Sequence, residues 1–246
     1  MEGQAAKKDI VQQLQREVLS LQGFKKPTEE QVRRTGLGPI EDAFPGQVFP
    51  IAAIHEFISR AAEDAAATCG FISCLLGQLM KSSGACLWVS TRRIVFPPAL
   101  KIFGLDPQRI IFIDLVKQKE ALWAIEEALK CEALSVVIGE LSELTFTQSR
   151  RLQLAVEQSR VTGFIHRYGP RTEDPLACVT RWKITPLPSL VEDGLPGVGF
   201  PRWNVQLLKV RNGKPGAWLL EWSAGNFQHI AEQALFLPHI HKRKTG

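Results

Sequence analysis

The stretch AAIHEFISRAAEDAAATCGFISCLLG, residues 52–77, decides the fold class. Its first eight residues form a short apolar run that predicts a buried strand, and Ala61 to Met80 predicts a helix rich in alanine, leucine and cysteine. A strand, a tight turn and a helix of small residues form the place where a nucleotide-binding fold holds phosphate groups. Here the frame of such a fold is present, but the sequence of a phosphate-binding loop is not.

Apolar strands and helices alternate along the chain on both sides of this stretch. We expect one strand or a pair over VFPIAAIHEFIS, and further strands at ACLWVST, RIIFID, LSVVIGEL and TGFIHRY. The intervening helices are expected over Lys117–Lys130 and TFTQSRRLQLAVEQSR, with a short helix between Pro97 and Gly104. Strands that are apolar throughout and alternate with helices predict a mainly parallel sheet flanked by helices on both faces.

The pattern changes after Gly169. PLACVTRWKITPLP predicts a strand that carries polar residues, and RWNVQLLKVRNGKPGAWLLEW predicts a hairpin with NGKPG as its turn. The predicted fold class is therefore α/β, with a C-terminal antiparallel hairpin extension.

The ends of the chain differ in composition from this core. Residues 1–24 predict a protruding amphipathic N-terminal helix, and the candidate partner-binding residues on its apolar face are Val11, Leu14, Val18 and Leu21. Residues 25–47 are polar and rich in glycine and proline, as in a linker. We expect the core domain with its hairpin over residues 48–226 and a basic tail over 227–246.

Bulk composition indicates a globular chain without membrane spans. The 246 residues are 45% hydrophobic and carry a net charge of +5, which permits contact with nucleic acid but does not require it. No apolar run reaches 18 residues and the N-terminus does not resemble a secretory signal, so we expect a cytoplasmic protein. The five cysteines form no CxxC pair, and we expect them to be reduced and packed in the core.

The order of these elements resembles the core of the RecA recombinase family. Four motifs give a closer resemblance, to the ImuA family of RecA-like accessory proteins in bacterial damage-induced mutagenesis: IHE at Ile54–Glu56, LWVSTRR at Leu87–Arg93, VVIGEL at Val136–Leu141, and PRWNVQLLKVRNGKPGAWLLEW at Pro201–Trp222. The resemblance spans about residues 5–222. The last motif is the most specific, because its Arg-Asn-Gly turn lies between strands bounded by aromatic residues.

The phosphate-binding region has the wrong residues for ATP. It contains Arg60, Glu63, Asp64 and Gly70, with no lysine and no second glycine at the required spacing. A carboxylate about 4 Å from a phosphate costs roughly 4 kcal/mol at an effective dielectric of 20, before screening. Repulsion therefore outweighs the attraction of the helix N-terminus, although Glu63 and Asp64 are equally typical of the first turn of an ordinary helix.

Two other parts of a RecA-like ATPase are also missing. The resemblance places Gly139 where such enzymes carry a magnesium-binding aspartate, and Glu140 follows it on the opposite face of the strand. The segment WVSTRR has no carboxylate to orient water. We find no catalytic residues, no cofactor site and no metal site, and we expect HIH at His239–His241 to be a solvated tail.

Basic residues gather on the predicted C-terminal strands. A candidate nucleic-acid or partner patch comprises Arg181, Lys183, Lys209, Arg211 and Lys214. Tryptophans at 182, 203, 218 and 222 are suited to stacking on bases if they are exposed, although strand alternation favours a core position for Trp182. A solvated face, contact with single-stranded DNA and a protein interface all remain open for this patch.

The resemblance implies a non-catalytic adaptor. ImuA-like proteins work beside ImuB, a partner related to Y-family polymerases, and beside an error-prone polymerase of the replicative α-subunit type. We expect binding to a RecA-family recombinase, to an ImuB-like protein, or to a second copy of the chain. Two alternatives are a SulA-like inhibitor of the division GTPase and a weak DNA-dependent ATPase.

Overall fold

The computed structural model describes residues 35–80, 84–93, 95–172, 174–190 and 199–231. These residues build a single nine-stranded sheet with the order β3-β2-β4-β5-β1-β6-β7-β8-β9. The strands are β1 (Ile54–Ser59), β2 (Ala85–Ser90), β3 (Ile110–Asp114), β4 (Leu134–Leu141), β5 (Thr162–Tyr168), β6 (Thr180–Leu187), β7 (Arg202–Val210), β8 (Gly216–Ser223) and β9 (Asn226–His229).

The sheet has a parallel part and an antiparallel part. Neighbouring strands from β3 to β6 run parallel, and β7, β8 and β9 continue the sheet in alternating directions. The predicted α/β class, with a mainly parallel sheet and an antiparallel C-terminal hairpin, is confirmed. The sequence did not predict β9, which pairs with β8 and begins at Asn226. The segment 227–246, expected as a tail, therefore starts inside this strand.

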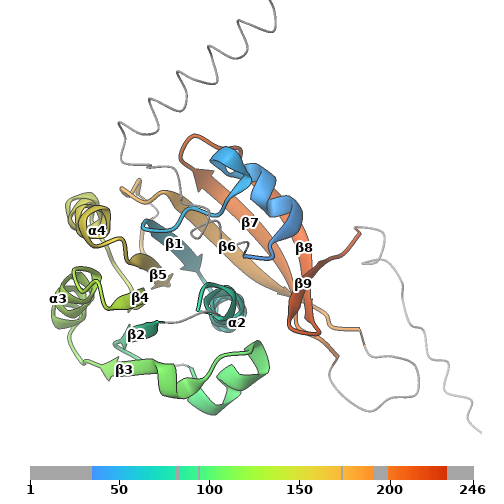
Figure 1. The fold of residues 1–246 in the computed structure, drawn as a ribbon, viewed down its shortest axis with the longest axis horizontal. Helices are drawn as coiled ribbons and strands as arrows, with labels where there is room; N and C mark the ends of the chain where they lie inside the picture. The colour runs from blue at the N-terminus through green and yellow to red at the C-terminus, as the bar shows by residue number, and fades with distance from the viewer. Residues whose placement is uncertain (1–34, 81–83, 94, 173, 191–198, 232–246) are drawn as a thin grey trace, which may run out of the picture. The chain divides into compact units, whose positions relative to one another are not determined.

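Helices cover both faces of the parallel part (Figure 1). The helix α2 (Ala62–Leu79) packs on one face, and α3 (Gln118–Leu129) and α4 (Phe146–Ser159) pack on the other. β1 is buried at all six positions, because it lies between the two layers of helices. This explains why its sequence shows no regular alternation, and its polar residues His55, Glu56 and Ser59 are buried as well. No helix in the described residues is long and apolar enough to cross a membrane.

Part of the predicted linker is folded against the sheet. Within 25–47, the described residues form two short 3-10 helices, η2 (Gly38–Ala43) and η3 (Pro45–Gln47). Leu37, Ile40 and Phe44 are buried in the core on the α2 face. His229 Nε2 lies 2.9 Å from the Leu37 carbonyl oxygen, which fastens this segment to β9. These apolar side chains are spaced three or four residues apart. The sequence did not predict their burial, because the surrounding glycine, proline and acidic residues are typical of a linker.

The predicted N-terminal helix over 1–24, with Val11, Leu14, Val18 and Leu21, lies outside the described residues. It stays a prediction, and so does the HIH segment at residues 239–241.

Two glycines within α2 meet different neighbours. A Cβ atom added at Gly77 would lie 2.7 Å from the Phe103 carbonyl oxygen, which belongs to the 3-10 helix η4 (Pro97–Phe103). A Cβ atom added at Gly70 would lie 3.2 Å from Trp203 Cζ2, a side-chain atom. Gly77 therefore permits close backbone approach, whereas Gly70 leaves nearly enough room for a methyl group.

We expect Gly77→Ala to destabilise the protein by up to about 2 kcal/mol. Alanine gains about 1 kcal/mol of helix propensity at either glycine, and forcing a methyl group against backbone costs about 1–3 kcal/mol. Gly70→Ala is the matched control in the same helix, and its free energy of unfolding should stay within about 0.5 kcal/mol of wild type. Urea unfolding measures both variants, and equal losses would contradict this account of how α2 packs.

Candidate functional site

The carboxyl ends of the parallel strands form the candidate site, because open α/β sheets bind ligands outside this edge. β1 ends at Ser59 and α2 begins at Ala62, so only Arg60 and Ala61 connect them. The Ala61 backbone N–H donates to the Asp64 carboxylate over 3.4 Å, which places Asp64 as a capping residue of α2. Glu63 lies in the same first turn. Both acids therefore complement the positive end of the helix dipole. This is the ordinary role of first-turn helix acids, which the sequence left open as an alternative to repelling phosphate.

The predicted phosphate-loop residues do not form one loop. Gly70 lies well inside α2, where it faces Trp203 of β7. A phosphate-binding loop needs a longer connection, whose backbone N–H groups converge on the ligand. Arg60, Glu63 and Asp64 are together at the start of α2, and Gly70 is separated from them by two helical turns.

Gly139 and Glu140 face opposite sides of β4, as strand geometry predicts. A Cβ atom at Gly139 would lie 2.3 Å from Ile125 Cδ1, so this glycine allows α3 to pack closely on the sheet. Glu140 is buried on the α2 face, where its Oε1 accepts a 2.7 Å hydrogen bond from Trp88 Nε1. Burial raises the pKa of Glu140 to about 7; the Trp88 hydrogen bond opposes this shift and nearby Asp114 adds to it.

Two further side chains lie beside Glu140 that the sequence did not point to as site residues. The Cys69 Sγ atom of α2 is 4.0 Å from Nδ1 of His166, which belongs to β5. Burial lowers the pKa of His166 to about 4, and burial also raises the pKa of the Cys69 thiol, with the negative charge of Glu140 adding to the rise. One donor atom from each of Cys69, Glu140 and His166 lies within 4.8 Å of the others. Nothing in their sequence spacing indicates this meeting, because the three residues come from separate elements.

Asp114 is the last residue of β3 and lies at the same carboxyl edge of the sheet. Its carboxylate accepts a 3.0 Å hydrogen bond from Ser90 Oγ and forms an ion pair with Arg93 over 2.5 Å. The carboxylate that is missing from WVSTRR is therefore supplied nearby by β3, but an arginine neutralises it.

A buried charge network occupies the opposite face of the sheet. Glu56 of β1 forms ion pairs with Arg167 Nη1 over 2.9 Å and with Arg181 Nε over 2.6 Å. The side chains of Glu56 and Arg167 are each only 1% exposed. Two arginines therefore share one carboxylate, which joins β1 to both of its neighbours, β5 and β6.

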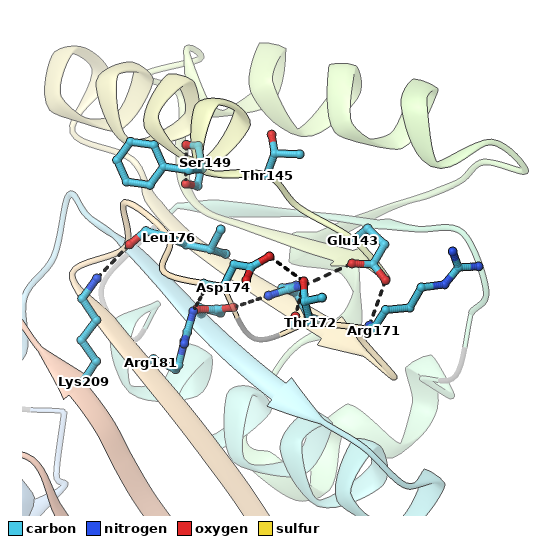
Figure 2. Close-up of polar contacts among 12 residues, drawn as sticks. Glu143, Thr145, Ser149, Arg171, Thr172, Asp174, Leu176, Arg181 and Lys209 are labelled. Carbon is cyan, nitrogen blue, oxygen red and sulfur yellow. Dashed lines mark hydrogen bonds and ion pairs between the residues drawn. The ribbon is translucent and has the colours of Figure 1, made fainter.

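The same arginines hold the connection between β5 and β6. Arg167 Nη2 donates to the Thr172 carbonyl oxygen over 2.9 Å. Arg181 Nη2 donates to the Asp174 carbonyl oxygen over 2.6 Å (Figure 2). Glu143 accepts a hydrogen bond from the Arg171 backbone N–H over 2.9 Å. The network thus holds the described residues of the β5–β6 connection on the face of the sheet that α3 and α4 cover.

The predicted basic patch is only partly a free surface. Arg181 and Lys209 lie opposite each other on β6 and β7, and Lys209 Nζ donates to the Leu176 carbonyl oxygen over 2.8 Å (Figure 2). Lys183 and Arg211 are half-buried, and Lys214 is exposed in the β7–β8 turn. The structure therefore brings Arg181, Lys183 and Lys209 together on β6 and β7, but uses Arg181 and Lys209 to hold the β5–β6 loop.

The tryptophans belong mainly to the core. Trp182, Trp203 and Trp222 are buried and Trp218 is half-buried against the same cluster. The expected core position of Trp182 is confirmed, and the exposure that base stacking requires is not met by the three buried rings. Four of the five cysteines are buried free thiols, as expected, but Cys131 is exposed because it follows the end of α3.

Comparison with known proteins agrees with this arrangement. The family model of the cell division inhibitor SulA matches residues 53–163, which run from β1 into the start of β5. Protein ImuA of Caulobacter vibrioides (strain NA1000 / CB15N) is 34% identical over 220 residues, covering 84% of this chain and 89% of that protein. The cell division inhibitor SulA of Yersinia pestis (strain Pestoides F) is 33% identical over 93 residues, covering 38% of this chain and 55% of that protein.

β6, β7, β8 and β9 lie beyond the region that matches the SulA family model. The chain belongs to the ImuA family, as the motifs in the sequence implied.

We expect Glu56→Gln to lower the free energy of unfolding by about 3–5 kcal/mol. The substitution keeps the shape of the side chain but leaves Arg167 and Arg181 without their shared negative charge in a buried site. Glu120→Gln is the matched control, because Glu120 pairs with Lys117 at the surface and such pairs contribute about 1 kcal/mol or less. Urea unfolding of both variants measures the difference, and similar small losses would show that the buried network does not stabilise the fold.

Proposed function

We propose that this chain is a non-catalytic accessory protein of damage-induced mutagenesis, which acts by binding other proteins. The observation that carries the proposal is the 34% identity to an ImuA protein over 84% of the chain. The parallel sheet covered on both faces and the antiparallel extension support the RecA-like core that the motifs imply. We place the protein in the cytoplasm, where a damage response acts on the chromosome.

The start of α2 supports a role without ATP hydrolysis. Arg60 and Ala61 alone connect β1 to α2, and the first turn of the helix carries Glu63 and Asp64. A triphosphate placed there would meet two carboxylates and no lysine, and each such contact costs several kcal/mol before screening. The two carboxylates nearest to the position of the missing magnesium ligand already have partners, Glu140 with Trp88 and Asp114 with Arg93.

Exposed apolar side chains support a role in protein binding. Ile111 of β3 is 53% exposed, Val116 in the following connection 93% and Trp123 of α3 66%. β3 is at one end of the sheet order, so its outer backbone edge pairs with no strand in the described residues. An open strand edge beside apolar side chains is a surface on which a protein partner can dock.

The proposed partners are a RecA-family recombinase and an ImuB-like Y-family protein, with an error-prone polymerase in the same assembly. The proposed contact surfaces are the N-terminal residues Val11, Leu14, Val18 and Leu21, and the basic residues Arg181, Lys183, Lys209, Arg211 and Lys214. Self-association and DNA contact through the basic residues are parts of the same proposal.

We expect the full chain to capture its host's RecA or ImuB-like protein in a pull-down without added nucleotide. Deleting residues 1–24 should weaken capture severalfold if the apolar helical face is the contact. Ile111→Lys tests the β3 edge, with Leu154→Lys as its control, because Leu154 is an exposed apolar residue of α4. Failure to capture either partner would contradict the adaptor, and capture of the division GTPase in the same experiment would replace it with a division inhibitor.

Division inhibition is the second candidate because the SulA family model matches residues 53–163. The coverage of the relatives favours mutagenesis instead. The Yersinia SulA aligns with 38% of the chain, and the Caulobacter ImuA aligns with 84%.

We expect magnesium and ATP to leave the melting temperature unchanged. A ligand present at 100 times its Kd stabilises a protein by about 2.7 kcal/mol, which for a chain of this size raises Tm by roughly 5–10 °C. A thermal-shift titration with and without magnesium makes the measurement. A saturable rise with ATP would support the weak ATPase, and would require a phosphate site elsewhere than at the start of α2.

A further inference from the structure

The cluster of Cys69, Glu140 and His166 has the chemistry of a metal site. It combines a thiol from α2, a carboxylate from β4 and an imidazole from β5, all at the carboxyl edge of the sheet. Exposed fractions are 8% for Cys69, 7% for Glu140 and 1% for His166, so the cluster is buried at all three members. An ion bound there would be held in mostly dry surroundings.

The spacing of the donor atoms is close to what a tetrahedral ion requires. Zinc bonds of roughly 2.0–2.3 Å to sulfur, nitrogen and oxygen hold neighbouring ligand atoms roughly 3.4–3.6 Å apart. The Cys69 Sγ and His166 Nδ1 atoms are 4.0 Å apart, and the three donor atoms all lie within 4.8 Å of one another. A contraction of at most about 1.4 Å between any two donor atoms, which side-chain rotation supplies, would complete three of the four ligand positions.

Neighbouring hydrogen bonds already orient two of these ligands. His166 Nε2 lies 2.9 Å from Ser59 Oγ, and Ser59 Oγ lies 2.8 Å from Thr68 Oγ1. If Nε2 carries the ring proton and donates it to Ser59, the lone pair of Nδ1 points toward Cys69. Trp88 Nε1 donates to Glu140 Oε1 and holds that carboxylate in place. Partners of this kind are typical around histidine and carboxylate ligands of bound metals.

We propose that Cys69, Glu140 and His166 bind one zinc ion, with water as the fourth ligand. Sulfur and imidazole ligands favour zinc over magnesium, which prefers oxygen ligands and six-coordinate geometry. The bound ion joins α2 to β4 and β5, and so fixes the edge where the phosphate-binding loop is missing. The site does not depend on the proposed function, because it requires no partner protein and no nucleotide.

The experiment is a metal titration of the full chain after removal of metal by a chelator. Co²⁺ serves as the spectroscopic probe, and Zn²⁺ is then added to displace it. We expect one Co²⁺ per chain, with the visible absorption of a four-coordinate ion and a thiolate-to-cobalt charge-transfer band. Zinc at 100 times its Kd should raise Tm by roughly 5–10 °C.

Matched variants assign the ligands. Cys69→Ala should abolish the charge-transfer band, and Cys74→Ala should keep it, because Cys74 is a buried free thiol of the same helix that lies outside the cluster. Glu140→Gln keeps the shape of the side chain and should weaken binding at least about tenfold. If Cys69→Ala fails to fold, Glu140→Gln still tests whether the cluster binds the metal.

Three results would overturn the site. They are a failure to bind one equivalent of Co²⁺ or Zn²⁺, a cobalt spectrum without a thiolate band, and a thiolate band that survives in Cys69→Ala. The double variant His239→Ala, His241→Ala guards against binding at the HIH segment and should leave the spectrum unchanged. Loss of binding in that double variant alone would assign the metal to the tail and contradict the proposal.

Discussion

The shared carboxylate of Glu56 is the interaction on which the sheet depends. Its two ion pairs, with Arg167 and Arg181, tie the central strand β1 to β5 on one side and to β6 on the other. β6 in turn pairs with β7, the first antiparallel strand, so this side chain holds the strand on which the antiparallel part of the sheet is built. Burying three charges is costly, and it is offset here because each arginine also donates to a backbone carbonyl of the loop above. The network thus sets the position of that loop as well as the join between strands.

The strands and helices could be predicted because burial on both faces leaves a strong signal. LSVVIGEL is apolar at nearly every position, and β4 occupies those same residues, Leu134–Leu141. The segment around η2 could not be predicted, because Leu37, Ile40 and Phe44 pack on strands that are distant in the sequence. Proline and glycine between them indicate a connector when the sequence is considered alone.

The candidate site was predictable only in part. The absence of a phosphate-binding loop follows directly from the residues at 60–64, since no lysine is present there. The partners of Arg181 do not follow from sequence, because its alternation with Trp182 indicates a face but cannot reveal Glu56, 125 residues earlier. The contact between Cys69 and His166 was unpredictable for the same reason. The two residues are 97 positions apart, and the parallel pairing of β1, β4 and β5 brings them together.

The central position of β1 has a consequence for how the protein is made. β1 is the first strand of the described residues to leave the ribosome, yet Glu56 must wait for Arg167, 111 residues later, and for Arg181, 125 residues later. At about 5–20 residues per second, that delay is roughly 6–25 s. During this time a strand whose native positions are all buried has neither of its neighbours, which is the condition under which nascent chains aggregate or recruit chaperones. Each copy of this protein therefore places a demand on the folding machinery of the cell until β6 has been made.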